Sequence, residues 1–417
     1  MGSICVLSIT KKNYIWNLIY SFVNAAQSML LMLLVNRIIN EDASGVFSYA
    51  FSVAVLFMYI GNFGIRNYQV SDIKEKYKIK DYYGFRILSC AVMLVASLLF
   101  VLIKHPDYTK TVALLALCGW RLAESMEDVF HGRYQQKGAL YLGCMQGTIR
   151  LASSDVAFLI ALYICRDLKG SCIVFCVANT ALIIIFALLT LSKYGGFKIG
   201  FKLDKLKGIF IECLPLFLGY FLSTYLCNVC KYSLERHLSN EIQAYYNMVF
   251  MPVLVINLLS TVIFRPLIVD MANLYNDNKL KDYKKIINKQ QLYILLIAVI
   301  IMPCVYFLGI PVLSVFYDSK LGPYRLILMI LMLGGIFSAY SSFINVCIIT
   351  IRKQNILIIA TVIIALIAAG LTEIMVIKFE LLGAALSYLI VMILQAVAYL
   401  LIHEISLKKK ANSLVKE

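Results

Sequence analysis

The stretch SKYGGFKIGFKLDKL, residues 192–206, divides the chain into two halves of similar character. It is rich in lysine and glycine, whereas the segments on both sides of it are long and apolar. About 20 consecutive apolar residues are enough for a helix to cross the hydrocarbon core of a membrane, and many of these segments reach that length. The stretch therefore predicts a basic linker, residues 193–207, between two sets of membrane-spanning helices.

The composition of the whole chain favours a membrane protein. Of the 417 residues, 61% are hydrophobic and 15% are charged. Soluble domains carry about 25% charged residues. The apolar segments are too long and too continuous for the alternating strands of a membrane barrel. They predict an all-α polytopic fold with about twelve transmembrane helices, at residues 14–39, 43–64, 83–103, 111–131, 139–164, 171–192, 208–231, 243–268, 289–316, 325–350, 355–378 and 381–403.

The basic residues predict the orientation of these helices. With a cytoplasmic N-terminus, far more lysines and arginines fall in cytoplasmic gaps than in outer ones, and Arg66 and Arg86 count among the cytoplasmic ones. An even number of helices also places the C-terminus in the cytoplasm. We expect an N-terminal six-helix lobe at 1–192, a C-terminal six-helix lobe at 208–403 and a basic cytoplasmic tail at 404–417. The net charge of +16 then reflects topology, and no nucleic acid partner is expected.

The two halves show signs of an internal repeat. A shift of 199 residues places residues 35–57 on residues 234–256, with Arg37 on Arg236 and, further on, Arg66 on Arg265. Both halves then have an outer polar turn that begins with arginine, an apolar span, and an arginine at the inner end. Repeats related by an axis along the membrane normal commonly enclose a site near the midplane. Two generic helical hairpins would show the same layout, so both interpretations stay open.

Charged residues within the fourth and fifth predicted helices need an explanation. A charge at the centre of a membrane helix costs about 2.5–3.5 kcal/mol on insertion scales. Arg121 and Glu124 are i,i+3 neighbours and can partly neutralise each other. Arg150 and Asp155 lie about 140° apart around their helix, so each needs a partner elsewhere or water. The favoured interpretation is a cation-lined cavity, and the alternative is a buried ion-pair network that joins the two helices. Glu127 and Asp128 are expected only at the cytoplasmic interface.

Further polar residues are candidates for the wall or the mouth of such a cavity. Asn17 and Asn24 share one face of the first helix with two serines, where they would either line the cavity or hydrogen-bond to other helices. Pro215 would kink the seventh helix. The candidates for a cavity mouth or gate are Arg37, Arg66, Glu212, Pro215, Lys231, Arg236 and Arg265.

The motifs of common enzymes and metal proteins are missing from the sequence. It has no phosphate-binding glycine loop, no nucleophile elbow and no metal-type histidine pair. Most of the twelve cysteines lie in apolar segments, where they act as small hydrophobes. We therefore expect no catalytic residue, no metal and no cofactor, and we expect a protein that is not an enzyme. The gaps between the predicted helices are too short to hold a soluble catalytic domain.

Three stretches resemble a known family. GVFSYAFSVAVLFMYIGNFGIRNYQVSD (45–72), RLAESMEDVFHGRYQQKG (121–138) and residues 214–268 are similar to the MOP exporter superfamily, and within it to the Wzx-type polysaccharide flippases of O-antigen, lipopolysaccharide and capsule synthesis. The resemblance implies a MATE-like fold in the bacterial cytoplasmic (inner) membrane. It also implies that an undecaprenyl-diphosphate-linked oligosaccharide is moved to the outer leaflet by alternating access.

The resemblance also implies roles for individual residues. Arg121 and Arg150 would neutralise the diphosphate. The sequence does not fix how transport is coupled to an energy source, and Glu124 and Asp155 are the candidates for an H⁺ or Na⁺ site. Membrane lipids and the polysaccharide polymerase and chain-length machinery would be further partners. The main alternative is an ion-coupled, MATE-like exporter of small molecules. A peptidoglycan-precursor flippase would usually have additional helices, and a membrane glycosyltransferase would be expected to have a large outer loop.

Overall fold

The computed structural model describes residues 2–72, 75–264, 271, 274, 275, 277–351 and 353–416. Within these residues the chain is helical and has no strand. The helices of the first half are α1 (Gly2–Ile38), α2 (Glu41–Asn62), α3 (Ile65–Ser71), α4 (Ile79–Lys104), α5 (Tyr108–Gln136), α6 (Leu140–Cys165), α7 (Leu168–Thr190) and η1 (Leu191–Tyr194). They are followed by α8 (Leu203–His237), α9 (Asn240–Phe264), α11 (Leu280–Cys304), η3 (Val305–Gly309), α12 (Ile310–Tyr317), η4 (Gly322–Tyr324), α13 (Arg325–Thr350) and α14 (Gln354–Lys416).

The all-helical prediction is confirmed for the described residues. Over the residues that the structure describes, each predicted span falls on helical segments, and residues 265–268 of the eighth span lie outside them. Helix α14 contains two of the spans, and Glu380, with φ 49° and ψ −127°, interrupts its helical backbone between them. Nine helical stretches in the described ranges are long and apolar enough to cross a membrane. That twelve helices cross it, with both termini in the cytoplasm, stays a prediction.

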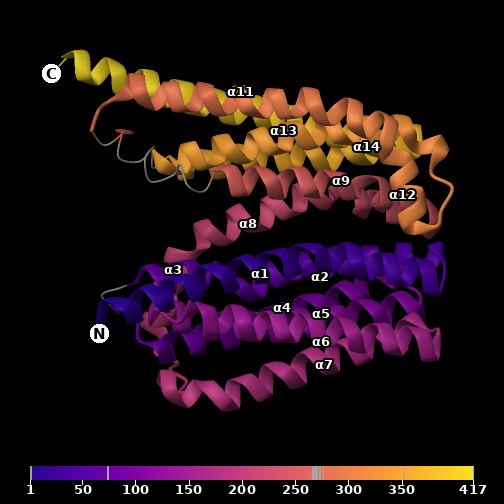
Figure 1. Cartoon of the computed structure of the whole chain (residues 1–417), viewed down its shortest axis with the longest axis horizontal. Coiled ribbons are helices and arrows are strands. Elements are labelled where there is room, and N and C mark those ends of the chain that lie inside the picture. Colours follow the sequence, from indigo (N-terminus) through magenta and orange to yellow (C-terminus); the bar gives the residue numbers. More distant parts are fainter. Residues whose placement is uncertain are drawn as a thin grey trace. The chain divides into compact units, whose positions relative to one another are not determined.

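The chain forms two compact units. Unit 1 is Met1–Thr224 and unit 2 is Tyr225–Glu417, so the boundary lies inside α8. In unit 1 the long helices lie alongside one another, and α3 lies at the end that also holds the N-terminus (Figure 1). In unit 2, α9, α11, α13 and α14 form a second bundle. The predicted lobe boundaries at residues 192 and 208 stay predictions.

The helix ends agree with the proposed internal repeat. α1 ends at Ile38 and α2 begins at Glu41, whereas α8 ends at His237 and α9 begins at Asn240. Both pairs are related by the same 199-residue shift, from 38 to 237 and from 41 to 240. The connection between α1 and α2 is fixed by Asn40, whose side chain accepts a hydrogen bond from the Ala43 N–H at 2.8 Å. This N-cap satisfies one of the free backbone donors at the start of α2.

Helix α5 is the central element of unit 1. It packs against α2, α3, α4, α6 and α7. Helices α5 and α4 approach α2 closely at Gly61, where a Cβ would lie 2.8 Å from Ser125 Oγ on α5 and 2.9 Å from Met93 Sδ on α4. Trp120 is fully buried, with its ring 4.8 Å from that of Phe175 and 5.8 Å from that of Phe51. This packing holds the polar face of α5 in a defined place.

Candidate functional site

The site is built on one face of α5. Arg121, Glu124, Glu127, Asp128 and His131 recur at spacings of three and four residues, which places them along one side of a helix. The helix extends to Gln136, five residues beyond the predicted end at 131. Glu127 is therefore inside the bundle, with 4% of its surface exposed. Glu127 thus belongs to a buried network, and its expected position at the cytoplasmic interface of the membrane stays a prediction.

Arg121 and Glu124 form the predicted ion pair within α5. The Arg121 Nη1 atom contacts a Glu124 carboxylate oxygen, and both side chains are mostly buried. The Arg121 guanidinium also lies 3.7 Å from the centroid of the Trp120 ring and 5.0 Å from that of Phe51. Cation–π contacts of this kind favour a charged arginine away from water. Arg121 is therefore held on three sides.

Arg150 joins three helices. Its side chain is completely buried on α6. Nη2 lies 3.2 Å from Glu124 Oε1 and Nε lies 2.9 Å from Glu127 Oε2, both on α5. Nη1 donates to Asn179 Oδ1 on α7 at 2.7 Å. The desolvation cost of this buried charge is offset by two carboxylates and an amide oxygen.

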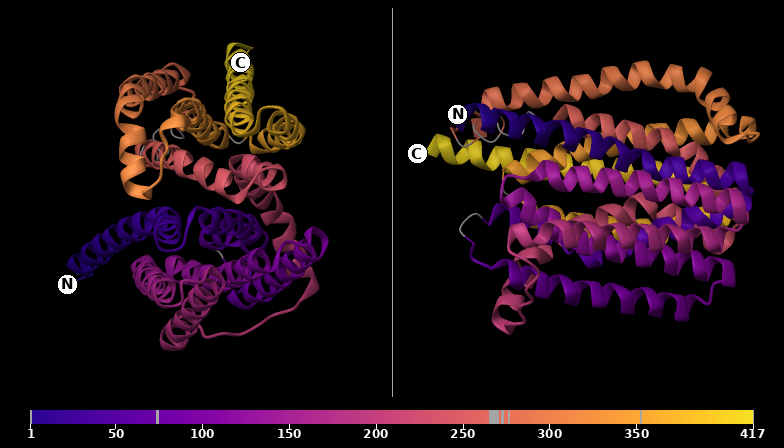
Figure 2. Two further views of the ribbon diagram at one scale, coloured as in Figure 1. Left: turned by 90° about the vertical axis from the view of Figure 1, so that its right-hand side faces the viewer. Right: turned by 60° about the horizontal axis from the view of Figure 1, so that its bottom comes forward.

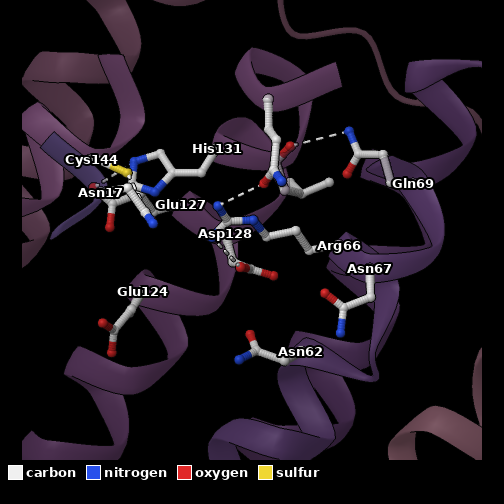
Figure 3. A network of polar contacts seen from close by, with 12 residues as sticks. Asn17, Asn62, Arg66, Asn67, Gln69, Glu124, Glu127, Asp128, His131 and Cys144 are labelled. Carbon is white, nitrogen blue, oxygen red and sulfur yellow. Dashed lines mark hydrogen bonds and ion pairs between the residues drawn. The ribbon is translucent and has the colours of Figure 1, made fainter. Parts of the chain in front are cut away.

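Asp128 lies between two arginines from other helices. Its Oδ2 atom is 2.8 Å from Arg86 Nη2 on α4, and its Oδ1 atom is 3.4 Å from Arg66 Nη1 on α3. Arg86 is fully buried and also donates to Gly61 O at 2.5 Å and Asn62 Oδ1 at 3.2 Å. Arg66 is 26% exposed and also donates to Gln135 Oε1 at 3.1 Å. Figure 3 shows Arg66 extending from α3 to Asp128. Arg86 is thus locked in place, and Arg66 is held more loosely.

These side chains surround a cavity of about 170 Å³ within unit 1. The network around it contains four arginines and three carboxylates, so it has one surplus positive charge when all of them are ionised. His131 adds a ring nitrogen 3.5 Å from Glu127 Oε1. Among the described residues, no group of three His, Cys, Asp or Glu side chains could hold a metal ion. The cavity is lined by Tyr20, Asn24, Met58, Asn62, Arg66, Arg121, Glu124, Glu127, Asp128 and His131.

Comparison with known proteins identifies the family. The family model described as "Polysaccharide biosynthesis protein" matches residues 10–272, which is more than half of the chain. The chain belongs to this family. A relative of this chain is the capsular polysaccharide biosynthesis protein CapF of Staphylococcus aureus, which is 23% identical over 395 residues, 93% of this chain and 98% of that protein.

Solved structures share the fold of this polysaccharide biosynthesis protein. The inward-facing structure of a multidrug resistance MATE family transporter of the MOP superfamily has a TM-score of 0.72 at 13% identity, over 95% of this chain and 96% of that one. The lipid II flippase MurJ, in an inward closed conformation, has a TM-score of 0.70 at 15% identity, over 95% and 91%. The expected polysaccharide biosynthesis family is confirmed, and so is the expected MATE-like fold. The protein is a multi-pass membrane protein, and the two solved structures that share its fold are those of a transporter and a flippase.

The cavity of this family member brings together some of the residues expected from sequence. Arg121, Glu124, Arg66 and Asn24 line it, and Arg150 contacts Glu124 behind its wall. Asp155 is outside the cavity lining. Its carboxylate accepts a hydrogen bond from Gln27 Nε2 on α1 at 2.9 Å. Asn17 lies near the same end of unit 1 as His131, where its Oδ1 atom accepts a weak hydrogen bond from the Cys144 thiol at 3.8 Å (Figure 3).

Glu212, one of the expected gate residues, joins α8 to the turn before α4. It pairs with Lys76 Nζ and accepts a hydrogen bond from Tyr77 Oη at 3.0 Å. The turn itself is organised by Asp72, which accepts hydrogen bonds from the Lys76 and Tyr77 N–H groups and from Tyr82 Oη. Burial raises the pKa of Asp72, but these three donors outweigh it and hold the pKa below the usual value. Glu212 is therefore part of a fixed connection within unit 1.

The other expected gate residues are spread over the chain. Pro215 lies inside the first part of α8, in unit 1. Arg37 is exposed in the last turn of α1. In unit 2, Lys231 lies 5.6 Å from the Phe250 ring centroid, and Arg236 Nη1 lies 3.3 Å from Glu373 Oε1. Arg265 lies outside the described residues. None of these four described residues lines the cavity of unit 1.

Several residues of the network were missed from sequence. Glu127 had a usable signal, because it follows Glu124 by three residues and precedes His131 by four, on one helix face. Arg86 had one as well, because the predicted span 83–103 already contained it although it was counted with a cytoplasmic loop. Asn179, which accepts from Arg150, had no signal, because its contact is made across 29 residues.

Proposed function

We propose that the protein moves an undecaprenyl-diphosphate-linked oligosaccharide across the bacterial cytoplasmic (inner) membrane, from the cytoplasmic to the outer leaflet. The two-unit MOP-type fold supports alternating access as the mechanism. The family membership supports a lipid-linked oligosaccharide as the substrate, with membrane lipids and the polysaccharide polymerase and chain-length machinery as partners.

The observation that carries the proposal is the surplus arginine at the cavity. Asp128 is neutralised at 2.8 Å by the buried Arg86, so Arg66, at 3.4 Å, can leave it without stranding a buried carboxylate. Arg66 is also the most exposed arginine of the network and lines the cavity. A guanidinium binds phosphate oxygens through two parallel hydrogen bonds. Arg66 is thus the residue we assign to the diphosphate, with Arg121 beside it.

The size of the cavity limits what it would bind. Pockets for whole drug-sized ligands have volumes of about 300–1,000 Å³. The cavity of unit 1, at about 170 Å³, is smaller. It would hold a phosphate-sized part of the substrate, whereas the sugars and the lipid tail would lie elsewhere.

The two acids proposed for ion coupling differ in their surroundings. Both oxygens of Glu124 are engaged by arginines, Oε2 by Arg121 and Oε1 by Arg150. Such a carboxylate is strongly held in its charged form. Asp155 has an amide partner, Gln27, and no cation within ion-pair distance among the described residues. If transport is coupled to H⁺ or Na⁺, Asp155 is the better candidate.

The charge balance also bears on the alternative of a small-molecule exporter. A cavity for cationic drugs needs surplus carboxylate, whereas this network has surplus arginine. The proposed substrate is anionic and matches that sign.

The test uses a strain that lacks the gene and a set of variants. We expect the strain to accumulate an undecaprenyl-diphosphate oligosaccharide and to lose surface glycan, and the intact gene to reverse both. Arg66→Gln should not reverse them although the protein is present in normal amounts, because Arg86 still neutralises Asp128. Arg236→Gln is the matched control, since it also removes a partly exposed arginine from an ion pair.

Two results would contradict the proposal. Unchanged lipid-linked sugars and surface glycan in the deletion strain would exclude the substrate. Full complementation by Arg66→Gln, at normal protein level, would exclude the assigned role of Arg66.

A further inference from the structure

The linker between α7 and α8 is ordered although it is not helical. Residues 196–202 lie between η1 and α8, and the backbone N–H of Gly200 donates to Lys80 O at 2.9 Å. The two chain segments approach so closely that a Cβ on Gly84 would clash with the Gly200 carbonyl. Phe197 lies with its ring centroid 5.0 Å from that of Tyr83. In Figure 2, left, this segment runs along the outside of the unit 1 helices. It is therefore fixed against α4, at the surface of the unit.

The fixed segment presents apolar side chains outward. Phe197, Ile199, Phe201 and Leu203 alternate with other residues and are between 45% and 78% exposed. A water-facing linker would lose free energy by exposing such side chains. The segment also joins two helices that are long and apolar enough to cross a membrane, Leu168–Tyr194 and Leu203–His237. Its position is therefore at a membrane surface, where apolar side chains can enter the lipid.

Lysines alternate with these apolar side chains. Lys198, Lys202, Lys205 and Lys207 are all exposed, and Asp204 is the only acid between residues 193 and 207. Among the described residues, no carboxylate pairs with Lys198, Lys202 or Lys207, and Lys205 lies 5.5 Å from the Tyr77 ring centroid. These ammonium groups are available to an external anion.

We propose that residues 196–207 form an interfacial anchor that binds the head groups of anionic phospholipids. Phe201 and Leu203 would enter the acyl region, and Lys198 and Lys202 would contact lipid phosphates. Apolar side chains combined with lysines are the pattern that binds anionic membrane surfaces, and each charge near such a surface adds to the attraction. The anchor would hold this end of unit 1 at a fixed depth. It does not depend on which substrate the cavity takes.

The test measures which lipids surround the segment. Phe201→Trp places a fluorophore at an exposed position, and Trp16→Phe in the same protein leaves the buried Trp120 as background. The full chain is reconstituted with phosphatidylcholine and phosphatidylglycerol, of which one or the other is brominated at the same acyl position. We expect brominated phosphatidylglycerol to quench the introduced tryptophan at least about twofold more than brominated phosphatidylcholine at equal mole fraction, because surface lysines concentrate anionic lipid.

The controls distinguish lipid binding by the lysines of the anchor from a general attraction of anionic lipid by the positive charge of the protein. Lys198→Gln with Lys202→Gln should abolish the preference, whereas Lys408→Gln with Lys409→Gln, an equal loss of exposed charge in unit 2, should not. Added salt should reduce the preference in the protein with all its lysines, so the result does not depend on the stability of the variants. No quenching by either lipid, equal quenching by both, or an equal loss in the control pair would overturn the proposal.

Discussion

The fourth long helix of each unit, α5 in unit 1 and α13 in unit 2, shows how the two halves differ. In unit 1, the middle of α5 carries Arg121, Glu124, Glu127 and Asp128. In unit 2, α13 begins with Arg325 and has no Asp, Glu, Lys or Arg in the rest of its length. The turns between the first and second helices of the units match in position, but the charges of the fourth helices do not. The matching turns agree with an internal repeat, whereas the buried charged network lies on the helix of unit 1 alone among these two.

Helix α13 uses small residues where α5 uses charges. A Cβ on Gly334 would lie 2.6 Å from the Tyr388 ring of α14, and one on Gly335 would lie 2.9 Å from Val253 Cγ1 of α9. Small residues of this kind let membrane helices approach closely and gain van der Waals contact. Close packing fixes α13, whereas α5 has buried ion pairs in addition to close packing. Substitutions in the two helices should therefore fail for different reasons.

The largest effect is expected from Arg150→Met. It leaves the buried carboxylates of Glu124 and Glu127 without their shared partner, and breaking a buried pair in this way costs about 3–5 kcal/mol. We expect a much lower midpoint of thermal unfolding in detergent and a lower amount of protein in the membrane.

A double variant tests whether the loss of stability comes from the unpaired buried carboxylate. Glu124 keeps its pair with Arg121, whereas Glu127 loses its arginine, so Arg150→Met with Glu127→Gln removes the stranded charge and should recover part of the lost stability. Arg236→Met, at a partly exposed ion pair in unit 2, should cost no more than about 1 kcal/mol. If Arg150→Met were as stable as the parent protein, the ion pairs would not hold α5 and α6 together.

A smaller effect is expected from Gly335→Leu on α13. The new side chain meets Val253, and overpacking of a well-packed helix contact costs about 1–3 kcal/mol. Gly370→Leu is the matched control in the same unit, because no atom lies within 4 Å of a Cβ there. Thermal unfolding of both variants would measure the difference. Equal midpoints would show that α13 does not depend on close packing at Gly335.

The same contrast explains what could be predicted from sequence. The apolar blocks predicted the helices because membrane crossing requires a fixed length of apolar chain. The Arg121–Glu124 pair was predictable because it lies within one helix, at spacing i,i+3. The partners of Arg150 were harder to predict. Glu127 had a signal on its helix face but was expected at the interface because the apolar pattern ends near residue 131, whereas α5 continues to Gln136, and Asn179 on α7 had no signal. Arg86 was near the start of its predicted span and was counted with a cytoplasmic loop, whereas α4 starts at Ile79 and places it inside the helix.

Long-range contacts lay beyond the sequence pattern altogether. Gln27 and Asp155 are 128 residues apart and meet only because α1 packs on α6. No spacing rule relates two such positions in a single sequence. The contacts between side chains of different helices are thus the least predictable part of the site, although the helices that carry these side chains were the most predictable part.

The smallest effect on stability, and the finest comparison, concerns the fifth helices. Asp155 on α6 is 8% exposed and bonded to the neutral Gln27, whereas Glu373 on α14 is partly exposed and bonded to Ser233, Arg236 and His237. Glu373→Gln should cost about 0–1 kcal/mol of folding stability because its ion pairs are partly exposed. Asp155→Asn should also unfold near the parent temperature, because an amide can still accept the Gln27 hydrogen bond.

The two variants should differ in transport. Asp155→Asn removes an acid that can gain and lose a proton or bind sodium, so translocation should lose its dependence on external pH or sodium. Glu373→Gln should keep that dependence. Clearance of lipid-linked oligosaccharide, followed at two external pH values with and without sodium, measures this difference. An unchanged ion dependence in Asp155→Asn would remove Asp155 from the coupling mechanism and leave the arginine network of α5 as the feature that distinguishes unit 1.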